Sequence, residues 1–190
     1  MMGHDYLTSP VTFLIDTLFG LYTLALLLRF ILGWVRADFY NPVCQFLVKI
    51  TNPPVIFTRR FIPSLRGIDL ATLSLVLLLN VVSLLLIMLL NNSPLNILSL
   101  LIMAITKILQ QGFNILTFSL IIQAVLSWVS PAQSSPVSGL LTAINEPLLK
   151  RIRRFIPPLS GLDLSVLFAL ILLQFVKMLI LPPLMLLSGY

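Results

Sequence analysis

Residues 70–90 read LATLSLVLLLNVVSLLLIMLL and contain no ionisable side chain. At about 1.5 Å per residue, an α-helix of this length spans the ~30 Å hydrocarbon core of a bilayer. The turn residues Asn91-Asn92-Ser93-Pro94 follow directly and end the run. This stretch therefore predicts a transmembrane helix over residues 70–90.

Three further apolar runs predict three more membrane-spanning helices, at residues 11–35, 106–129 and 164–181. The first follows Ser9-Pro10, a pair that suits the start of a helix. An apolar turn or a helix extension over residues 95–105 is expected to precede the second. The third is expected to stop at Pro182-Pro183.

The composition agrees with a membrane protein. The 190 residues are 58% hydrophobic and 9% charged, whereas soluble domains carry about 25% charged residues. We therefore predict an all-α membrane protein with four transmembrane helices. Basic residues outnumber acidic ones, 12 to 6, and lie beside the apolar runs, which favours anionic lipid headgroups over nucleic acid as their partner.

The segments between the paired spans are copies of each other. A shift of 94 residues places Trp34–Leu70 on Trp128–Leu164 without a gap, with sixteen of the 37 positions identical. The matches include Arg59-Arg60-Phe61-Ile62-Pro63 with Arg153-Arg154-Phe155-Ile156-Pro157. Matched proline and glycine positions also fix backbone shape, which shared apolar composition does not explain. The sequence thus contains an internal repeat.

The two units cover residues 1–93 and 94–190, and each has one long basic loop, residues 36–67 and 130–162. The N-terminus, the turn at residues 91–96 and the C-terminal tail contain no Lys or Arg. The positive-inside rule then places both loops in the cytoplasm, or in the stroma of a plastid, and both termini outside. Each unit crosses the membrane twice, so the repeats are expected to be parallel.

Both loops have the pattern of helices that lie in the membrane interface. Asn41-Pro42 opens a first short helix, and Asn52-Pro53 is expected to start a second one that ends at Arg59-Arg60. In the second loop, Glu146-Pro147 occupies the equivalent restart position, where a negative charge suits a helix N-terminus.

Three roles are open for the arginine pairs of the loops. In the first role, the pairs set the topology and contact lipid headgroups, which stabilises binding to an anionic surface by about 1 kcal/mol per basic residue. In the second role, they form ion pairs with Asp69 or Asp163, which could also cap the helix that follows. The third role is docking of a partner's acidic segment or of a phosphate. The first two are favoured because any basic loop provides them. We predict that the loop residues in contact with lipid or partner are Trp34, Arg59, Arg60, Asp69, Trp128, Lys150, Arg151, Arg153, Arg154 and Asp163.

Charged residues inside the predicted spans form a second candidate site. Asp16, Lys107 and Lys177 all map to the half of the membrane opposite the loops, and ionisable groups are costly in hydrocarbon. Asp16 is therefore expected to pair with Lys107 or Lys177, which would lock the two units together. A transport pathway would need a wider polar lining than these spans provide. Arg29 lies near the loop end of its span and is expected to snorkel to the interface.

Motifs of catalysis are missing from the sequence, which has no Walker loop, GxSxG or HExxH. His4 is the only histidine and Cys44 the only cysteine, so neither a disulfide nor a zinc site nor a catalytic triad is expected. We expect no enzymatic activity and no cofactor. A haem-handling role would have only His4 and the methionines as axial ligands.

The pattern W…NP…P…RRFIP…G.D occurs twice and resembles the YggT (YlmG) family of small integral membrane proteins. The second copy departs from it at Ser135, which replaces asparagine, and at Ser130 and Ala132, which stand where the first copy has Arg36 and Asp38. The resemblance covers nearly the whole chain. The positions of the first copy that match are Trp34, Asn41, Pro42, Pro53, Arg59, Arg60, Ile62, Pro63, Gly67 and Asp69.

This resemblance implies a bacterial inner-membrane protein linked with osmotic or salt stress tolerance. Plastid relatives are associated with cytochrome b6 maturation and nucleoid distribution. We expect a non-enzymatic scaffold or assembly factor at the cytoplasmic face, with anionic headgroups and unidentified membrane or cytoplasmic proteins as partners. The alternative is an ion or solute pathway, formed by a homo-oligomer around Asp16, Lys107 and Lys177.

Overall fold

The computed structural model describes residues 2–65, 67–129, 135–155 and 164–188, and these are arranged as six helices. Four of the helices, α1, α3, α4 and α6, are long and apolar enough to cross a membrane. The expected all-α fold with four candidate spans is therefore confirmed. The helices are α1 (Met2–Trp34), α2 (Pro42–Arg59), α3 (Leu70–Leu90), α4 (Ile97–Val129), α5 (Pro136–Ile152) and α6 (Ser165–Leu187).

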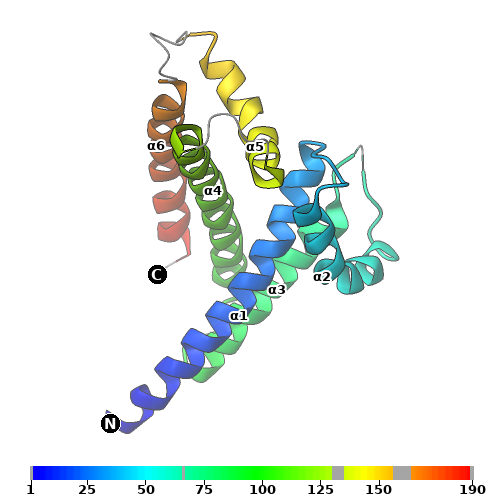
Figure 1. Cartoon of the computed structure of the whole chain (residues 1–190). Coiled ribbons are helices and arrows are strands. Elements are labelled where there is room, and N and C mark those ends of the chain that lie inside the picture. The colour runs from blue at the N-terminus through cyan, green and yellow to red at the C-terminus, as the bar shows by residue number, and fades with distance from the viewer. Residues whose placement is uncertain (1, 66, 130–134, 156–163, 189–190) are drawn as a thin grey trace.

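Each unit consists of two long helices with a shorter helix between them in the chain. In the first unit α1 packs along α3, and in the second α4 packs along α6. The short helices α2 and α5 both lie at the end of the molecule where α1 and α4 finish (Figure 1). The chain thus runs in the same direction through α1 and α4, so the two repeats are parallel.

Several helices continue through prolines at which the sequence predicts a helix boundary. Helix α1 begins at Met2 instead of Pro10, α2 and α5 are each one continuous helix, and α6 runs on to Leu187. Proline removes a helical hydrogen bond, but membrane-embedded helices tolerate it where neighbouring groups satisfy the freed carbonyl. The prolines inside helices are Pro10, Pro53, Pro54, Pro147, Pro182 and Pro183.

Residues 97–105 are helical and extend the predicted span, so that α4 is one continuous helix of 33 residues. The structure confirms that Asn41 and Asp69 cap the N-termini of α2 and α3, as predicted. The Asn41 side chain accepts a hydrogen bond from the backbone of Val43, and Asp69 accepts one from the backbone of Thr72. At the equivalent position of the second unit, Ser135 caps α5 through a reciprocal capping box with Ser138.

Buried apolar clusters hold the short helices onto the long ones. One cluster joins α1, α2 and α3 and includes Leu26, Val55 and Val76, which are fully buried. A second cluster joins the two units, because Cys44 and Leu47 of α2 pack with Leu140 and Ile144 of α5 around the end of α1. Burial raises the pKa of the Cys44 thiol, with a smaller contribution from Asp38. Cys44 is thus a small core residue.

Candidate functional site

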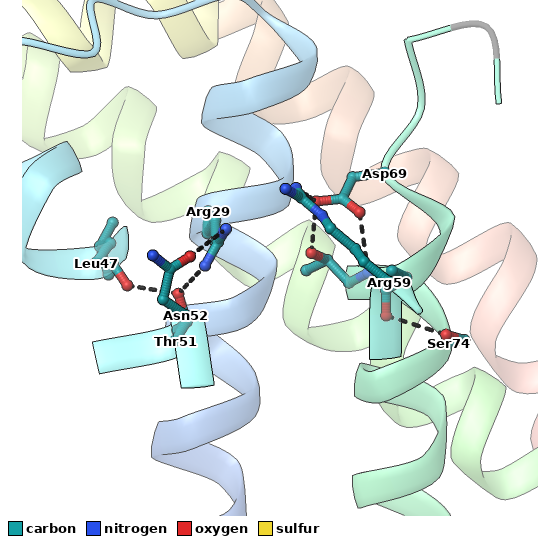
Figure 2. Close-up of polar contacts among 9 residues, drawn as sticks. Arg29, Leu47, Thr51, Asn52, Arg59, Asp69 and Ser74 are labelled. Atoms are coloured by element: carbon teal, nitrogen blue, oxygen red, sulfur yellow. Dashed lines mark hydrogen bonds and ion pairs between the residues drawn. The ribbon is translucent and has the colours of Figure 1, made fainter. Parts of the chain in front are cut away.

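Arg29, near the end of α1, holds the middle of α2. Its Nη1 donates to Oγ1 of Thr51 at 2.8 Å, and its Nη2 donates to Oδ1 of Asn52 at 3.0 Å (Figure 2). Thr51 is fully buried, and its hydroxyl donates to the Leu47 carbonyl one turn earlier. Arg29 is therefore bonded to α2, and its expected snorkelling to the interface stays a prediction. The expected role of Asn52 as a helix start is wrong. Asn52 instead lies inside α2 and accepts a hydrogen bond from the guanidinium.

The second unit has the same bridge without the charge. Gln123 and Asn145 lie 94 residues after Arg29 and Thr51, and Nδ2 of Asn145 donates to Oε1 of Gln123 at 2.7 Å. The Ser119 hydroxyl also donates to Oδ1 of Asn145, at 2.6 Å. Both units thus fasten the short helix to the preceding long helix at one matched place. An alignment of the two repeats upstream of Trp34 shows polar residues at both matched positions, but not that they contact each other.

Arg59 and Asp69 close the first loop. Nη2 of Arg59 donates to Oδ2 of Asp69 at 2.6 Å (Figure 2), and the Thr72 hydroxyl donates to the same oxygen at 2.7 Å. The predicted ion pair and the predicted cap of α3 are thus both present. Burial raises the pKa of the Asp69 carboxyl, but the hydrogen bonds from Arg59 and Thr72 outweigh this effect. The net pKa therefore lies below its ordinary value.

In the second unit, Arg153 pairs with an acidic residue of α5. Its Nη1 lies 3.2 Å from Oε2 of Glu146, seven residues earlier on α5. Glu146 is thus an ion-pair partner within a continuous helix, which corrects its expected role at a helix start. Asp163, the acidic residue equivalent to Asp69, lies outside the described residues.

The other loop cations within the described residues are exposed. Lys150 and Arg151 lie in the last turn of α5, Arg154 follows that helix, and Arg60 follows α2. Exposed aromatic rings accompany them, with Phe57 and Phe61 in an edge-to-face contact at the end of α2. Exposed cations next to exposed aromatic rings are typical of helices at a membrane interface.

The two tryptophans end the helices that precede the loops. Trp34 is the last residue of α1 and is exposed. Trp128 lies in the last turn of α4, and its side chain is outside the described part of the chain. Each tryptophan thus stands at the end of a candidate span, directly before a basic loop, and tryptophan is enriched at membrane–water interfaces.

The two short helices are joined at their N-terminal ends. Nδ2 of Asn41, the residue that caps α2, donates to the carbonyl of Pro136 in the first turn of α5 at 2.6 Å. Together with the buried contact of Cys44 and Leu47 with α5, this bond makes α2 and α5 one continuous surface at the loop end of the molecule.

Asp16 of α1 and Lys107 of α4 form an ion pair, one of the two pairings that the sequence left open. One turn further along α4, Nε2 of Gln111 donates to the Gly20 carbonyl at 3.2 Å and to Oγ1 of Thr23 at 3.1 Å. These polar contacts join the first helices of the two units at the point where α1 and α4 meet.

Lys177 of α6 does not extend this ion pair. Its Nζ donates to Oδ1 of Asn114 at 2.9 Å, which ties α6 to α4 within the second unit. Across the described residues, no group of three or more His, Cys, Asp or Glu side chains is placed to hold a metal ion.

Comparison with known proteins identifies the family. A family model described as CCB3/YggT matches the chain twice, at residues 8–90 and 102–184. The chain is 42% identical over 185 residues to an uncharacterized protein of Pseudomonas aeruginosa, an alignment that covers 96% of this chain and 94% of that protein. It is 35% identical over 171 residues to the uncharacterized protein YggT of Escherichia coli K12, covering 90% of this chain and 88% of the relative. No solved structure matches the chain. The chain belongs to the CCB3/YggT family and carries two tandem repeats of it.

Proposed function

We propose that this CCB3/YggT family member is a non-enzymatic scaffold or assembly factor of the bacterial inner membrane. It organises membrane or cytoplasmic partner proteins at the cytoplasmic face and contributes to osmotic or salt tolerance. The observation that carries the proposal is the joint surface of α2 and α5. These helices meet at their N-terminal ends, and each carries exposed cations of its repeat at its C-terminal end.

The paired and the exposed arginines divide this surface into two parts. Arg59 and Arg153 hold acidic residues of their own loops, so they shape the surface. Arg60 and Arg154 follow them directly and are exposed. We assign contact with anionic headgroups and with acidic partner segments to this second pair. Each such basic residue near an anionic surface contributes about 1 kcal/mol.

The contacts of the intramembrane charges support a scaffold over an ion pathway. Asp16 and Lys107 are joined to each other, and Lys177 is joined to Asn114. A packing role accounts for these contacts, because a paired charge in hydrocarbon costs much less than a single one. The charges then matter to function only through stability.

The exposed arginines give the test. Arg60→Gln with Arg154→Gln should abolish growth at high salt and capture of crosslinked partners from native membranes, at normal protein abundance. Lys177→Gln is the matched control, since it also removes a cation, but one that is bonded to the neutral Asn114 and lies away from the joint surface. Full salt tolerance of the arginine variant would contradict the proposal. Loss of an ion flux in Lys107→Gln and Lys177→Gln variants of normal abundance would favour the pathway instead.

A further inference from the structure

A groove with a volume of about 520 Å³ lies between the two units, bounded by α1, α4 and α5. Asp16, Gln111 and Asn114 lie at one end of it, and Leu141 and Ile144 of α5 line the end near the loops. The walls between these ends are mostly apolar and include Leu24 of α1 and Phe118 of α4. The groove is thus polar at one end and apolar along its length.

The groove follows the direction in which the helices would cross a membrane. Its α1 wall runs from Asp16 to Leu28, and twelve residues of helix cover about 18 Å at 1.5 Å per residue. This length is more than half of a ~30 Å hydrocarbon core. The α1 and α4 walls both belong to candidate membrane spans. The groove therefore opens within the hydrocarbon region.

Size and lining decide what fits this groove. An α-helix with its side chains is about 10–12 Å across, so the groove would take little more than one helical turn. Water is disfavoured because ordered water needs two to four polar partners, and the walls offer few. A slender apolar chain is the remaining occupant that a bilayer supplies.

The charged side chains at the polar end of the groove, near Asp16, complement a lipid headgroup. Asp16 and Lys107 are paired, yet 56% of the Asp16 side chain and 22% of the Lys107 side chain are exposed. A phospholipid with an ammonium and a phosphate complements a neighbouring carboxylate and ammonium. We propose that the groove binds one acyl chain of a zwitterionic aminophospholipid, from the leaflet opposite the loops, with its headgroup on Asp16 and Lys107.

Photolabelling in vesicles tests this site. The full-length protein is reconstituted in vesicles of phosphatidylethanolamine and phosphatidylglycerol that contain a trace of phosphatidylethanolamine with a diazirine in one acyl chain. Adducts should concentrate several-fold on residues 17–28 and 111–122 relative to the exposed residues of α6. The same diazirine on phosphatidylglycerol should label the groove several-fold less.

Two exposed leucines of α1 give matched variants that should both fold. Leu21 lines the groove and is 61% exposed, whereas Leu18 is 59% exposed and does not line it. Leu21→Trp should fill the groove and reduce its labelling several-fold, and Leu18→Trp should leave the labelling unchanged. Labelling that follows exposure alone, or that responds equally to both variants, would overturn the proposal. Equal labelling by the two headgroups, or a crosslink between two copies through Leu21→Cys, would overturn it as well.

Discussion

Tyr22 of α1 donates through its hydroxyl to the carbonyl of Ile50 in α2 at 3.3 Å. In an α-helix this carbonyl would accept from the N–H of residue 54, but residue 54 is proline and has no N–H. The tyrosine thus replaces the missing helical bond. In the second repeat the two equivalent positions are Leu116 and Leu148, where the backbone N–H is present and no hydroxyl is supplied.

This relationship predicts that Tyr22 and Pro54 are energetically coupled. Tyr22→Phe should lower the free energy of unfolding by about 1 kcal/mol, the usual net contribution of one hydrogen bond. In a Pro54→Leu background the same change should cost much less, because the restored N–H occupies the Ile50 carbonyl. Reversible unfolding of the four variants in mixed detergent micelles measures the coupling. Equal losses in both backgrounds would show that the hydroxyl does not serve this carbonyl.

The hydrogen bonds of Arg29 give a second prediction, in which residues of the first repeat are replaced by their equivalents from the second. Arg29→Gln should destabilise the protein by about 1.5–3 kcal/mol, the range for hydrogen bonds to a charged group. It leaves the buried Thr51 without its guanidinium donor. Adding Thr51→Asn recreates the Gln123–Asn145 pair of the second unit and should recover a large part of the loss. Thr51→Asn alone, which keeps Arg29, serves as the control for the size of the new side chain.

The spans, the repeat and the caps at Asn41 and Asp69 could be predicted, because apolar length, self-similarity and capping residues are visible in the sequence itself. A run such as residues 70–90 must be a membrane helix by length and polarity alone. Asn41 and Asp69 cap the helices that follow them because their carbonyl and carboxylate oxygens reach nearby backbone N–H groups.

The continuous course of α2 and the role of Arg29 could not be predicted from local patterns. Proline at position 54 indicates a break in an isolated helix, and only the packing of α1 against α2 supplies the hydroxyl of Tyr22. Arg29 likewise depends on Thr51 and Asn52, which lie 22 and 23 residues away on another helix. From charge alone, Asp16 could pair with either Lys107 or Lys177. The packing of α1 against α4 brings Asp16 to Lys107.

The Arg59–Asp69 pair gives a prediction about pH. The pKa of Asp69 lies below its ordinary value of 3.8, so its stabilising contribution is fully present above that pH. The contribution is lost as the pH falls through the lower pKa of the folded state. Wild type and Asp69→Asn should therefore differ by a constant amount in thermal stability from neutral pH to about pH 4. The difference should disappear under more acidic conditions.

Asp69→Asn and Arg59→Gln should also differ from each other. Asp69 caps α3 in addition to binding Arg59, whereas Arg59 is about half exposed, and exposed ion pairs contribute about 0–1 kcal/mol. The change at Asp69 should therefore be the more destabilising one at neutral pH. A larger loss from Arg59→Gln would mean that the pair, and not the cap, dominates.

Asp16 and Lys107 predict a coupled pair inside the membrane. Asp16→Asn should destabilise the protein, and Lys107→Gln in the same molecule should restore much of the loss, because a single charge in the hydrocarbon is the costly state. Lys177→Gln is the matched control, since Lys177 donates to Asn114 instead. Its effect should simply add to that of Asp16→Asn in a double-mutant cycle. Additivity for Lys107 as well would show that the pair contributes nothing in a bilayer.

The last prediction concerns the side of the membrane on which the joint surface of α2 and α5 lies. Cys44 is buried, and its raised thiol pKa makes it poorly reactive. Cys44→Ser, which copies Ser138 of the second repeat, provides a cysteine-free background. In intact cells a membrane-impermeant maleimide should label Asn92→Cys and Leu187→Cys, but not Asp38→Cys or Thr142→Cys, all four positions being exposed. The basic loops predict this outcome because Lys and Arg are retained in the cytoplasm. Labelling of positions 38 and 142 with protection of 92 and 187 would put the joint surface outside the cell, away from cytoplasmic partners, and the proposed scaffold role would fail with it.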